Sequence, residues 1–147
     1  MGEQAQRAGV ETLIVIDTDI FIDHFRGIQS ATEYLCNIPI IQRATTDINL
    51  MELMRGAANR KECNLLENFL NGNGFIRLPV TATASRIAVE LFRHYSYSHG
   101  LRIPEALVAG VVLELGLTLV TRNVKHFRFI PELKAIEPEY VRLLGVD

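Results

Sequence analysis

The stretch Leu13-Ile14-Val15-Ile16-Asp17-Thr18-Asp19 decides the fold. Four apolar residues run together without polar alternation, which is typical of a parallel strand covered by helices on both faces. Two carboxylates follow at the carboxyl end of that strand, where open α/β sheets bind their ligands. The stretch therefore predicts an α/β fold with a functional site that begins at Asp17.

A second strand of the same kind is predicted over residues 117–120, after Gly116, which is a plausible helix stop. It leads into Thr121-Arg122-Asn123, so Asn123 has the same kind of position as Asp17. Because crossovers between parallel strands are right-handed, the two strand ends can face one crevice. Taken singly, Asp17, Thr18 or Asp19 could each be the N-cap of the following helix, and Asn123 would be a turn or cap residue.

Two glutamates complete the candidate set. Residues 106–113 are apolar all round, which predicts a buried helix with Glu105 as the charge at its start. Pro104 suits a first helical turn, where the helix dipole favours a carboxylate, so a purely structural role for Glu105 is an equal alternative. Glu52 lies on a predicted helix over residues 48–57, where a solvated face with Arg55 as ion-pair partner explains it adequately.

The rest of the chain alternates helices with strands, which implies a mainly parallel, helix-covered sheet. The 147 residues are one domain's worth, with a polar N-terminal extension over residues 1–10. In the tail over residues 137–147, the apolar residues Tyr140, Val141, Leu143 and Leu144 are expected to pack on the same subunit. The remaining predicted elements are helices over residues 20–25, 31–36, 62–70 and 81–96, and strands over residues 38–44, 75–78 and, at an edge, 133–136.

Composition limits the class of protein. The net charge of −2 and the pI of about 6.1 are not those of a protein that holds nucleic acid by bulk electrostatics. Two cysteines without a CxxC pair predict reduced thiols and a cytoplasmic setting. Neither a secretory signal nor an apolar run of roughly 20 residues, which a membrane span needs, is present. The 48% hydrophobic content fits an apolar face covered by a partner, and we expect at least a homodimer.

Four motifs together resemble one family. The set resembles the PIN-domain ribonucleases, specifically the VapC-type toxins of prokaryotic toxin–antitoxin pairs, and the likeness extends from about residue 13 to about residue 136. No single motif is decisive, but their order and spacing are specific. The motifs are IDTDIFID (residues 16–23), MELMRGA (51–57), IPEALVA (103–109) and LVTRNVKHF (119–127).

The resemblance implies a PIN-like α/β/α sandwich and an endoribonuclease that depends on Mg²⁺ or Mn²⁺. It also implies inhibition by a cognate antitoxin and a dimeric state. Asp17 matches the first acid, Glu52 the acid of the second motif, and Glu105 a position where the family usually has Asp. Asn123 matches a fourth position that is Asp or Asn. These four are the expected catalytic residues.

Asp17, Glu105 and Asn123 are the expected metal ligands, and Thr121 and Asp19 match supporting positions. Converging carboxylates repel one another, so a bound cation makes the cluster tolerable and offsets the charge that develops on the scissile phosphate. Glu105 is one methylene longer than Asp, and Asn123 is neutral, so the four carry at most three negative charges. A preference for Mn²⁺, slow turnover and inactivity therefore all stay open.

Basic residues follow Asn123. Arg122, Lys125 and His126 are candidates for contact with RNA, although the ordinary explanation of such a run is a solvated face. Arg102 is a further cation whose placement the sequence does not give.

Two other functions are alternatives. A catalytically impaired scaffold that binds antitoxin or RNA without cutting is motivated by Glu105. The Asp17-Thr18-Asp19 sequence also resembles the nucleophile motif of haloacid-dehalogenase-like phosphatases, but Phe21 stands where that motif has a hydroxyl residue or Val.

Overall fold

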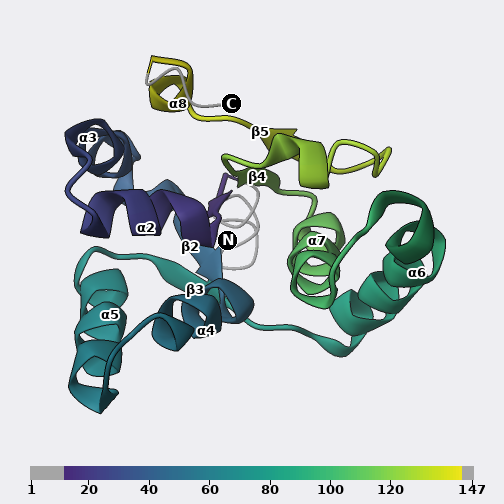
Figure 1. Ribbon diagram of the computed structural model, residues 1–147, viewed down its shortest axis with the longest axis horizontal. Helices are drawn as coiled ribbons and strands as arrows, with labels where there is room; N and C mark the ends of the chain where they lie inside the picture. Colours follow the sequence, from purple (N-terminus) through teal and green to yellow (C-terminus); the bar gives the residue numbers. More distant parts are fainter. Residues whose placement is uncertain (1–11, 144–147) are drawn as a thin grey trace, which may run out of the picture.

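The computed structural model describes residues 12–143, which are built around a five-stranded parallel sheet (Figure 1). The strand order is β3-β2-β1-β4-β5, and every neighbouring pair is parallel. The predicted parallel α/β fold is confirmed, with the predicted edge strand in place as β5. The strands are β1 (Ile14–Ile16), β2 (Arg43–Thr46), β3 (Ile76–Leu78), β4 (Thr118–Val120) and β5 (Lys134–Ile136).

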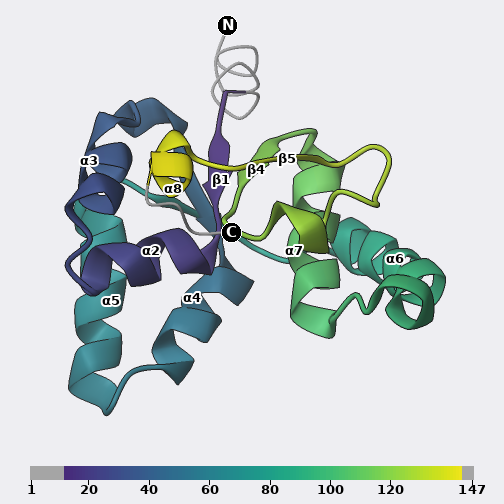
Figure 2. The same cartoon turned by 45° about the horizontal axis from the view of Figure 1, so that its top comes forward.

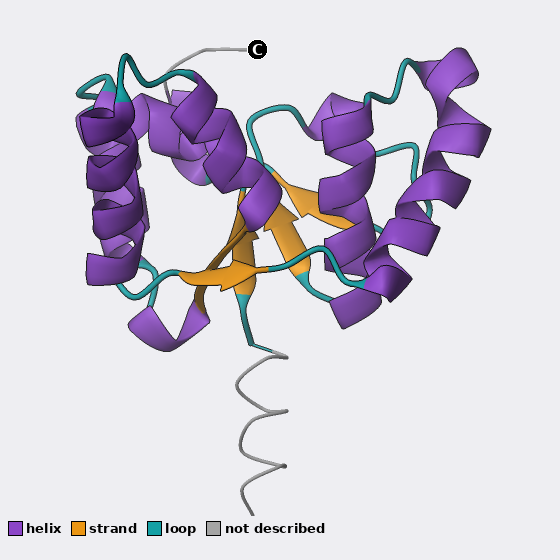
Figure 3. Ribbon diagram, turned by 90° about the horizontal axis from the view of Figure 1, so that it is seen from below, coloured by secondary structure: helices purple, strands orange, loops and turns teal. Residues whose placement is uncertain are grey.

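Helices cover both faces of the sheet, as the sandwich prediction requires. Helices α2, α3 and α5 lie on one side and α6 and α7 on the other, which Figure 1 and the view from below in Figure 3 both show. Short 3-10 turns occupy Ile40–Gln42 and Val124–His126. The helices are α2 (Thr18–Phe25), α3 (Gln29–Asn37), α4 (Asp47–Arg55), α5 (Arg60–Gly72), α6 (Ala82–His99), α7 (Ile103–Leu115) and α8 (Glu139–Leu143).

The central strands β1 and β4 are buried on both faces. Val15 and Leu119 belong to the core that packs against α6 and α7, whereas Ile16 and Val120 belong to the core that packs against α2 and α3. All four side chains are fully buried. Successive residues of a strand point to opposite faces, so a strand covered on both sides must be apolar throughout. This explains the uninterrupted apolar runs in the sequence.

The predicted strand over residues 38–44 is wrong in position. Strand β2 begins only at Arg43 and continues to Thr46. Ile40 and Ile41 lie instead in the 3-10 turn that follows Pro39, and their exposed fractions are 65% and 74%. Proline fixes its own φ and has no N–H for a strand ladder, so the turn starts there.

The C-terminal tail is partly as predicted. Tyr140 and Val141 of α8 are buried in the core beside α2 and α3, whereas Leu143 is 80% exposed, so its predicted packing is wrong. Leu144 and the N-terminal extension over residues 1–10 lie outside the described residues. Figure 2 shows α8 beside α3, at the opposite side of the molecule from α6. None of the helices in residues 12–143 is long and apolar enough to span a membrane.

Helices α6 and α7 pack closely at Gly110. A Cβ atom at this position would overlap the backbone carbonyl oxygen of Ala84 and press on the side chain of Ala88. The packing of α6 on the apolar α7 therefore depends on the absence of a side chain at residue 110.

We expect Gly110→Ala to destabilise the protein by about 1–3 kcal/mol, because the added methyl group must push α6 away from α7. Gly72→Ala, in α5, is the matched control, since a Cβ there meets nothing within 4 Å and alanine is the better helix former. Urea unfolding followed by circular dichroism measures both changes. Equal stability of the two variants would contradict the close-packing argument.

Candidate active site

Side chains from four distant motifs meet in one pocket at the carboxyl edge of the sheet. Asp17, Glu52, Glu105 and Asn123 all line this pocket, whose volume is about 140 Å³. They arrive from the end of β1, from α4, from the first turn of α7 and from the loop after β4. The predicted meeting of the strand ends is therefore confirmed, while the catalytic roles stay predictions. The other lining residues are Thr18, Asp19, Ile22, Arg102, Pro104, Val108, His126 and Phe127.

Asp17 is held by uncharged donors. Its Oδ1 accepts hydrogen bonds from the backbone N–H of Thr18 at 2.9 Å and from Nδ2 of Asn49 at 2.8 Å. Its Oδ2 accepts from the hydroxyl of Thr121 at 2.7 Å. Burial raises the pKa of Asp17 in spite of these bonds, and the charge of Glu105 adds to the rise. Asp17 is thus the N-cap of α2 and a pocket carboxylate at once.

Asp19 lies beside Asp17 and has one oxygen without a partner. Its Oδ2 accepts from the backbone N–H of Arg122 at 3.1 Å and from Nδ2 of Asn123 at 2.9 Å, and the Thr121 hydroxyl is 3.3 Å away. Its Oδ1 is buried with no hydrogen-bond partner. Burial, and then the charge of Asp17, raise the pKa of Asp19 to about 7. A proton or a cation would complete this pair of acids.

Glu105 is buried and fully engaged. Its Oε1 accepts from the backbone N–H of Arg102 at 3.0 Å and from Nε of the same residue at 3.1 Å. Its Oε2 lies 2.9 Å from Nδ1 of His126, which must carry the proton because a carboxylate oxygen accepts. The backbone contact closes the first turn of α7 in the manner of a capping box. Glu105 thus makes the structural contact expected at the start of the helix and lines the pocket as well, so both roles considered for it stay open.

Glu52 is exposed and lines one wall of the pocket. Partial burial raises the pKa of Glu52, and the charge of Asp17 raises it further. The expected ion pair with Arg55 is not among those found in residues 12–143. Glu52 therefore interacts with Asp17, Glu105 and the exposed Arg102 rather than with Arg55.

The donor chemistry of the pocket fits a hard divalent cation, because carboxylate and amide oxygens are the ligands that Mg²⁺ and Mn²⁺ prefer. The Oδ1 atom of Asp19 has no partner, and burial, with repulsion between the acids as a lesser cause, raises the pKa of Asp17, Asp19 and Glu52. Within residues 12–143, however, no three Asp, Glu, His or Cys side chains are grouped closely enough to hold an ion. Glu105 is bonded to Arg102 and His126 instead.

Of the predicted RNA-contact residues, Arg122 is committed to another task. Its Nη1 donates to Oδ1 of Asp23 at 2.6 Å, and the hydroxyl of Tyr140 donates to Oδ2 at 2.8 Å. The Asp23 side chain is 1% exposed, so this network is internal. Burial and the charge of Asp23 raise the pKa of Tyr140, which keeps its proton on the phenol. Contact with RNA stays a prediction for Arg122, for the exposed Lys125 and for His126, which is bonded to Glu105.

Two residues that bind the pocket acids were absent from the predicted set. Asn49 is fully buried and binds both Asp17 and Thr46, and Arg102 binds Glu105. The spacing of three residues between Thr46 and Asn49 is that of a reciprocal helix cap, a signal that was available in the sequence. Arg102 also precedes Glu105 by three residues, which is a spacing that brings helical side chains together.

The raised pKa of Asp19 predicts that the metal-free protein becomes less stable as the pH rises. The folded state keeps the proton on Asp19 to about pH 7, whereas the unfolded chain releases it near 3.8. The folded state therefore binds more protons between these values, and the free energy of unfolding falls across that window.

In EDTA, Asp19→Asn should abolish on the order of 1 kcal/mol of this loss, measured by urea unfolding at about pH 4.5 and about pH 7.5. Asn keeps an oxygen for the donors around Oδ2, so it removes the charge without removing the hydrogen bonds. Parallel pH profiles for the variant and the wild type would show that Asp19 ionises normally.

Comparison with known proteins agrees with this geometry. The family model of the PIN domain matches residues 14–132. Ribonuclease VapC10 of Mycobacterium tuberculosis is 29% identical over 127 residues, which cover 83% of this chain and 91% of that protein. Ribonuclease VapC19 of the same organism is 31% identical over 123 residues, which cover 82% of this chain and 96% of that protein.

Solved structures share the fold over most of the chain. A toxin–antitoxin complex from Klebsiella pneumoniae matches with a TM-score of 0.65 at 28% identity, over 84% of this chain and 95% of the matched chain. The VapBC-1 structure from nontypeable Haemophilus influenzae matches with a TM-score of 0.69 at 19% identity, over 85% and 97%, and shows the fold alone. The extent of the family match argues against the phosphatase alternative. The chain therefore belongs to the PIN-domain family, among its VapC-type members.

Proposed function

We propose that this protein is a metal-dependent endoribonuclease, the toxin of a VapC-type toxin–antitoxin pair. The observation that carries the proposal is the single pocket that gathers Asp17, Glu52, Glu105 and Asn123 at the carboxyl edge of the sheet. The relatives that are named ribonucleases support the reaction class. A homodimer and a cytoplasmic location stay predictions.

Asp17, Glu105 and Asn123 would hold the ion, and Mg²⁺ or Mn²⁺ bound there would offset the charge of the scissile phosphate and activate water. Asn49 and Thr121 fix the two oxygens of Asp17 in place, so this carboxylate is preorganised. Glu52 is the least constrained acid and has a raised pKa, which suits a group that takes a proton from the attacking water.

A catalytically impaired scaffold is the second candidate. The contacts of Glu105 with Arg102 and His126 favour it, because they occupy both oxygens of the third acid. Such a protein would bind RNA or an antitoxin without cutting.

An apolar groove beside the pocket is the proposed seat of the antitoxin. The groove has a volume of about 520 Å³, lies between α2, α4 and α5, and shares Ile22 with the active-site pocket. Phe25 and Leu65 in its walls are 46% and 59% exposed. Exposed apolar patches of this kind mark interaction sites, and the similar structure from Klebsiella pneumoniae is a toxin–antitoxin complex. An antitoxin segment bound in the groove could extend past Ile22 to the acids of the active-site pocket.

RNA cleavage tests the proposed activity. The purified protein is expected to cut a mixed small-RNA pool in Mg²⁺ or Mn²⁺ but not in EDTA. Asp17→Asn should lower the rate by about 100-fold or more, because it removes a charge that the ion needs. Glu105→Asp should raise the rate. The matched control is Asp47→Asn, which removes a carboxylate outside the pocket that is paired with Arg77.

Cleavage is read on a gel. Cutting that continues in EDTA, or that Asp17→Asn leaves unchanged, would contradict the proposal. Cleavage by Glu105→Asp alone would identify the wild type as the impaired scaffold.

Antitoxin binding tests the groove. Leu65→Glu places a charge in the apolar wall and should weaken the complex with the antitoxin encoded beside the gene by about tenfold or more, without changing RNA cleavage. Leu143→Glu is the control, since Leu143 is 80% exposed and outside the groove. Calorimetric titration gives both affinities, and equal affinities would place the antitoxin elsewhere.

A further inference from the structure

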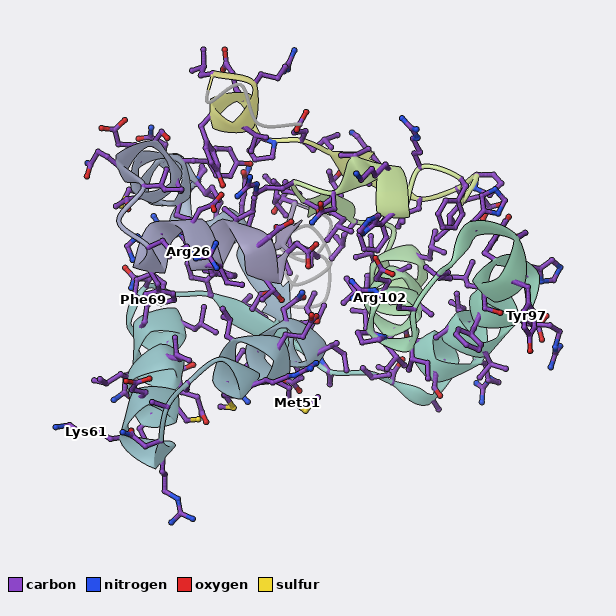
Figure 4. The ribbon with its side chains drawn as sticks, in the orientation of Figure 1. Arg26, Met51, Lys61, Phe69, Tyr97 and Arg102 are labelled. Atoms are coloured by element: carbon purple, nitrogen blue, oxygen red, sulfur yellow. The ribbon has the colours of Figure 1, made fainter. Side chains whose placement is uncertain are left out.

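Arg102 is the one lysine or arginine of residues 12–143 that lines the active-site pocket. In Figure 4 it lies beside α7, on the side of that helix toward α4. Its Nε donates to Oε1 of Glu105 at 3.1 Å, and its backbone N–H donates to the same oxygen at 3.0 Å. A permanent positive charge therefore already sits on one of the pocket acids.

The guanidinium feels more than one acid. The pKa of Arg102 is raised chiefly by Glu105 and, more weakly, by Glu52 and Asp17. These are three of the acids that converge on the pocket. The same negative charges that would attract a metal ion therefore attract the Arg102 guanidinium.

The contacts of Glu105 differ in how firmly they are held. The Glu105 side chain is 10% exposed, whereas the side chains of Arg102 and His126 are 69% and 41% exposed. A buried carboxylate is costly without partners, but an ion pair with an exposed arginine contributes little stability. The Arg102 side chain can therefore leave for solvent once another cation neutralises Glu105.

Side-chain length connects this contact to the sequence. A capping box takes Glu or Gln at its third helical position, because the side chain must reach back to the backbone N–H before the helix. Glu105 occupies this position and makes this contact. Its length, one methylene more than Asp, is what lets the carboxylate meet Arg102.

We propose that Arg102 is a built-in competitor of the metal ion, which neutralises Glu105 in the metal-free protein and must be displaced before Glu105 can act as a ligand. This inference rests on the metal dependence proposed above. It makes Arg102 a residue that sets the affinity of the site for the ion and takes no part in the reaction itself.

Mn²⁺ binding, measured by calorimetric titration without RNA, tests the competition in a double-mutant cycle. Arg102→Gln should bind Mn²⁺ about fivefold tighter than the wild type, because the ion no longer displaces the ion pair between Arg102 and Glu105. In the Glu105→Gln background, the same change should alter the affinity by less than about twofold. Arg60→Gln, which removes an equal charge from α5 outside the pocket, is the control for net charge.

The outcomes separate this inference from the proposed function. Equal Mn²⁺ affinity of the wild type and Arg102→Gln overturns the competition and leaves metal dependence standing. A gain that persists in the Glu105→Gln background, or that Arg60→Gln reproduces, shows an effect of charge alone and also overturns it. If neither the wild type nor any variant binds Mn²⁺, metal dependence and the competition fail together. Thermal unfolding of each variant confirms that it is folded.

Discussion

The rest of the site depends on one constraint, which is the burial of the Asp17 carboxylate where β1 and β4 end side by side. A buried acid needs donors, and this one takes them from α4 through Asn49 and from the end of β4 through Thr121. The same two donors bind further: Asn49 closes the cap of α4, and the Thr121 hydroxyl accepts from the backbone N–H of Asn123. The hydrogen bonds that satisfy Asp17 thus fix the start of α4, which carries Glu52, and the loop that carries Asn123.

The sequence was informative where burial alone decides the structure. The apolar runs of β1 and β4 reported strands covered on both faces, and their ends located Asp17 and Asn123 correctly. The run around Ile40 and Ile41 was misleading, because apolar composition does not say whether anything covers a residue, and these two are exposed. The hydrogen-bond partners of the acids could not be predicted from the sequence, for a different reason. The Asp17–Thr121 bond joins residues 104 positions apart, and its existence depends on the register of β1 against β4.

Glu105 shows how folding and chemistry can make opposite demands on one side chain. As a helix cap it is stabilised by three contacts that occupy both of its oxygens. As a ligand it would have to give some of them up. Stability and activity often trade against each other at such positions, because the arrangement that folds best is not the one that reacts best. The local signals that made Glu105 ambiguous in the sequence therefore correspond to one observed role, as a helix cap, and one proposed role, as a metal ligand.

The Asp23–Arg122–Tyr140 network gives the end of the chain a mechanical role. Helix α8 has only five residues and would not persist alone, yet its Tyr140 shares the buried Asp23 with the arginine that stands between Thr121 and Asn123. Removal of Tyr140 would leave Arg122 as the remaining side-chain partner of Asp23. The loop after β4, which carries the pocket residues Asn123 and His126, would then be held less firmly. Helix α8 therefore supports the site from a distance. A change that displaces α8 would alter the position of the loop after β4 and hence the geometry around the pocket acids.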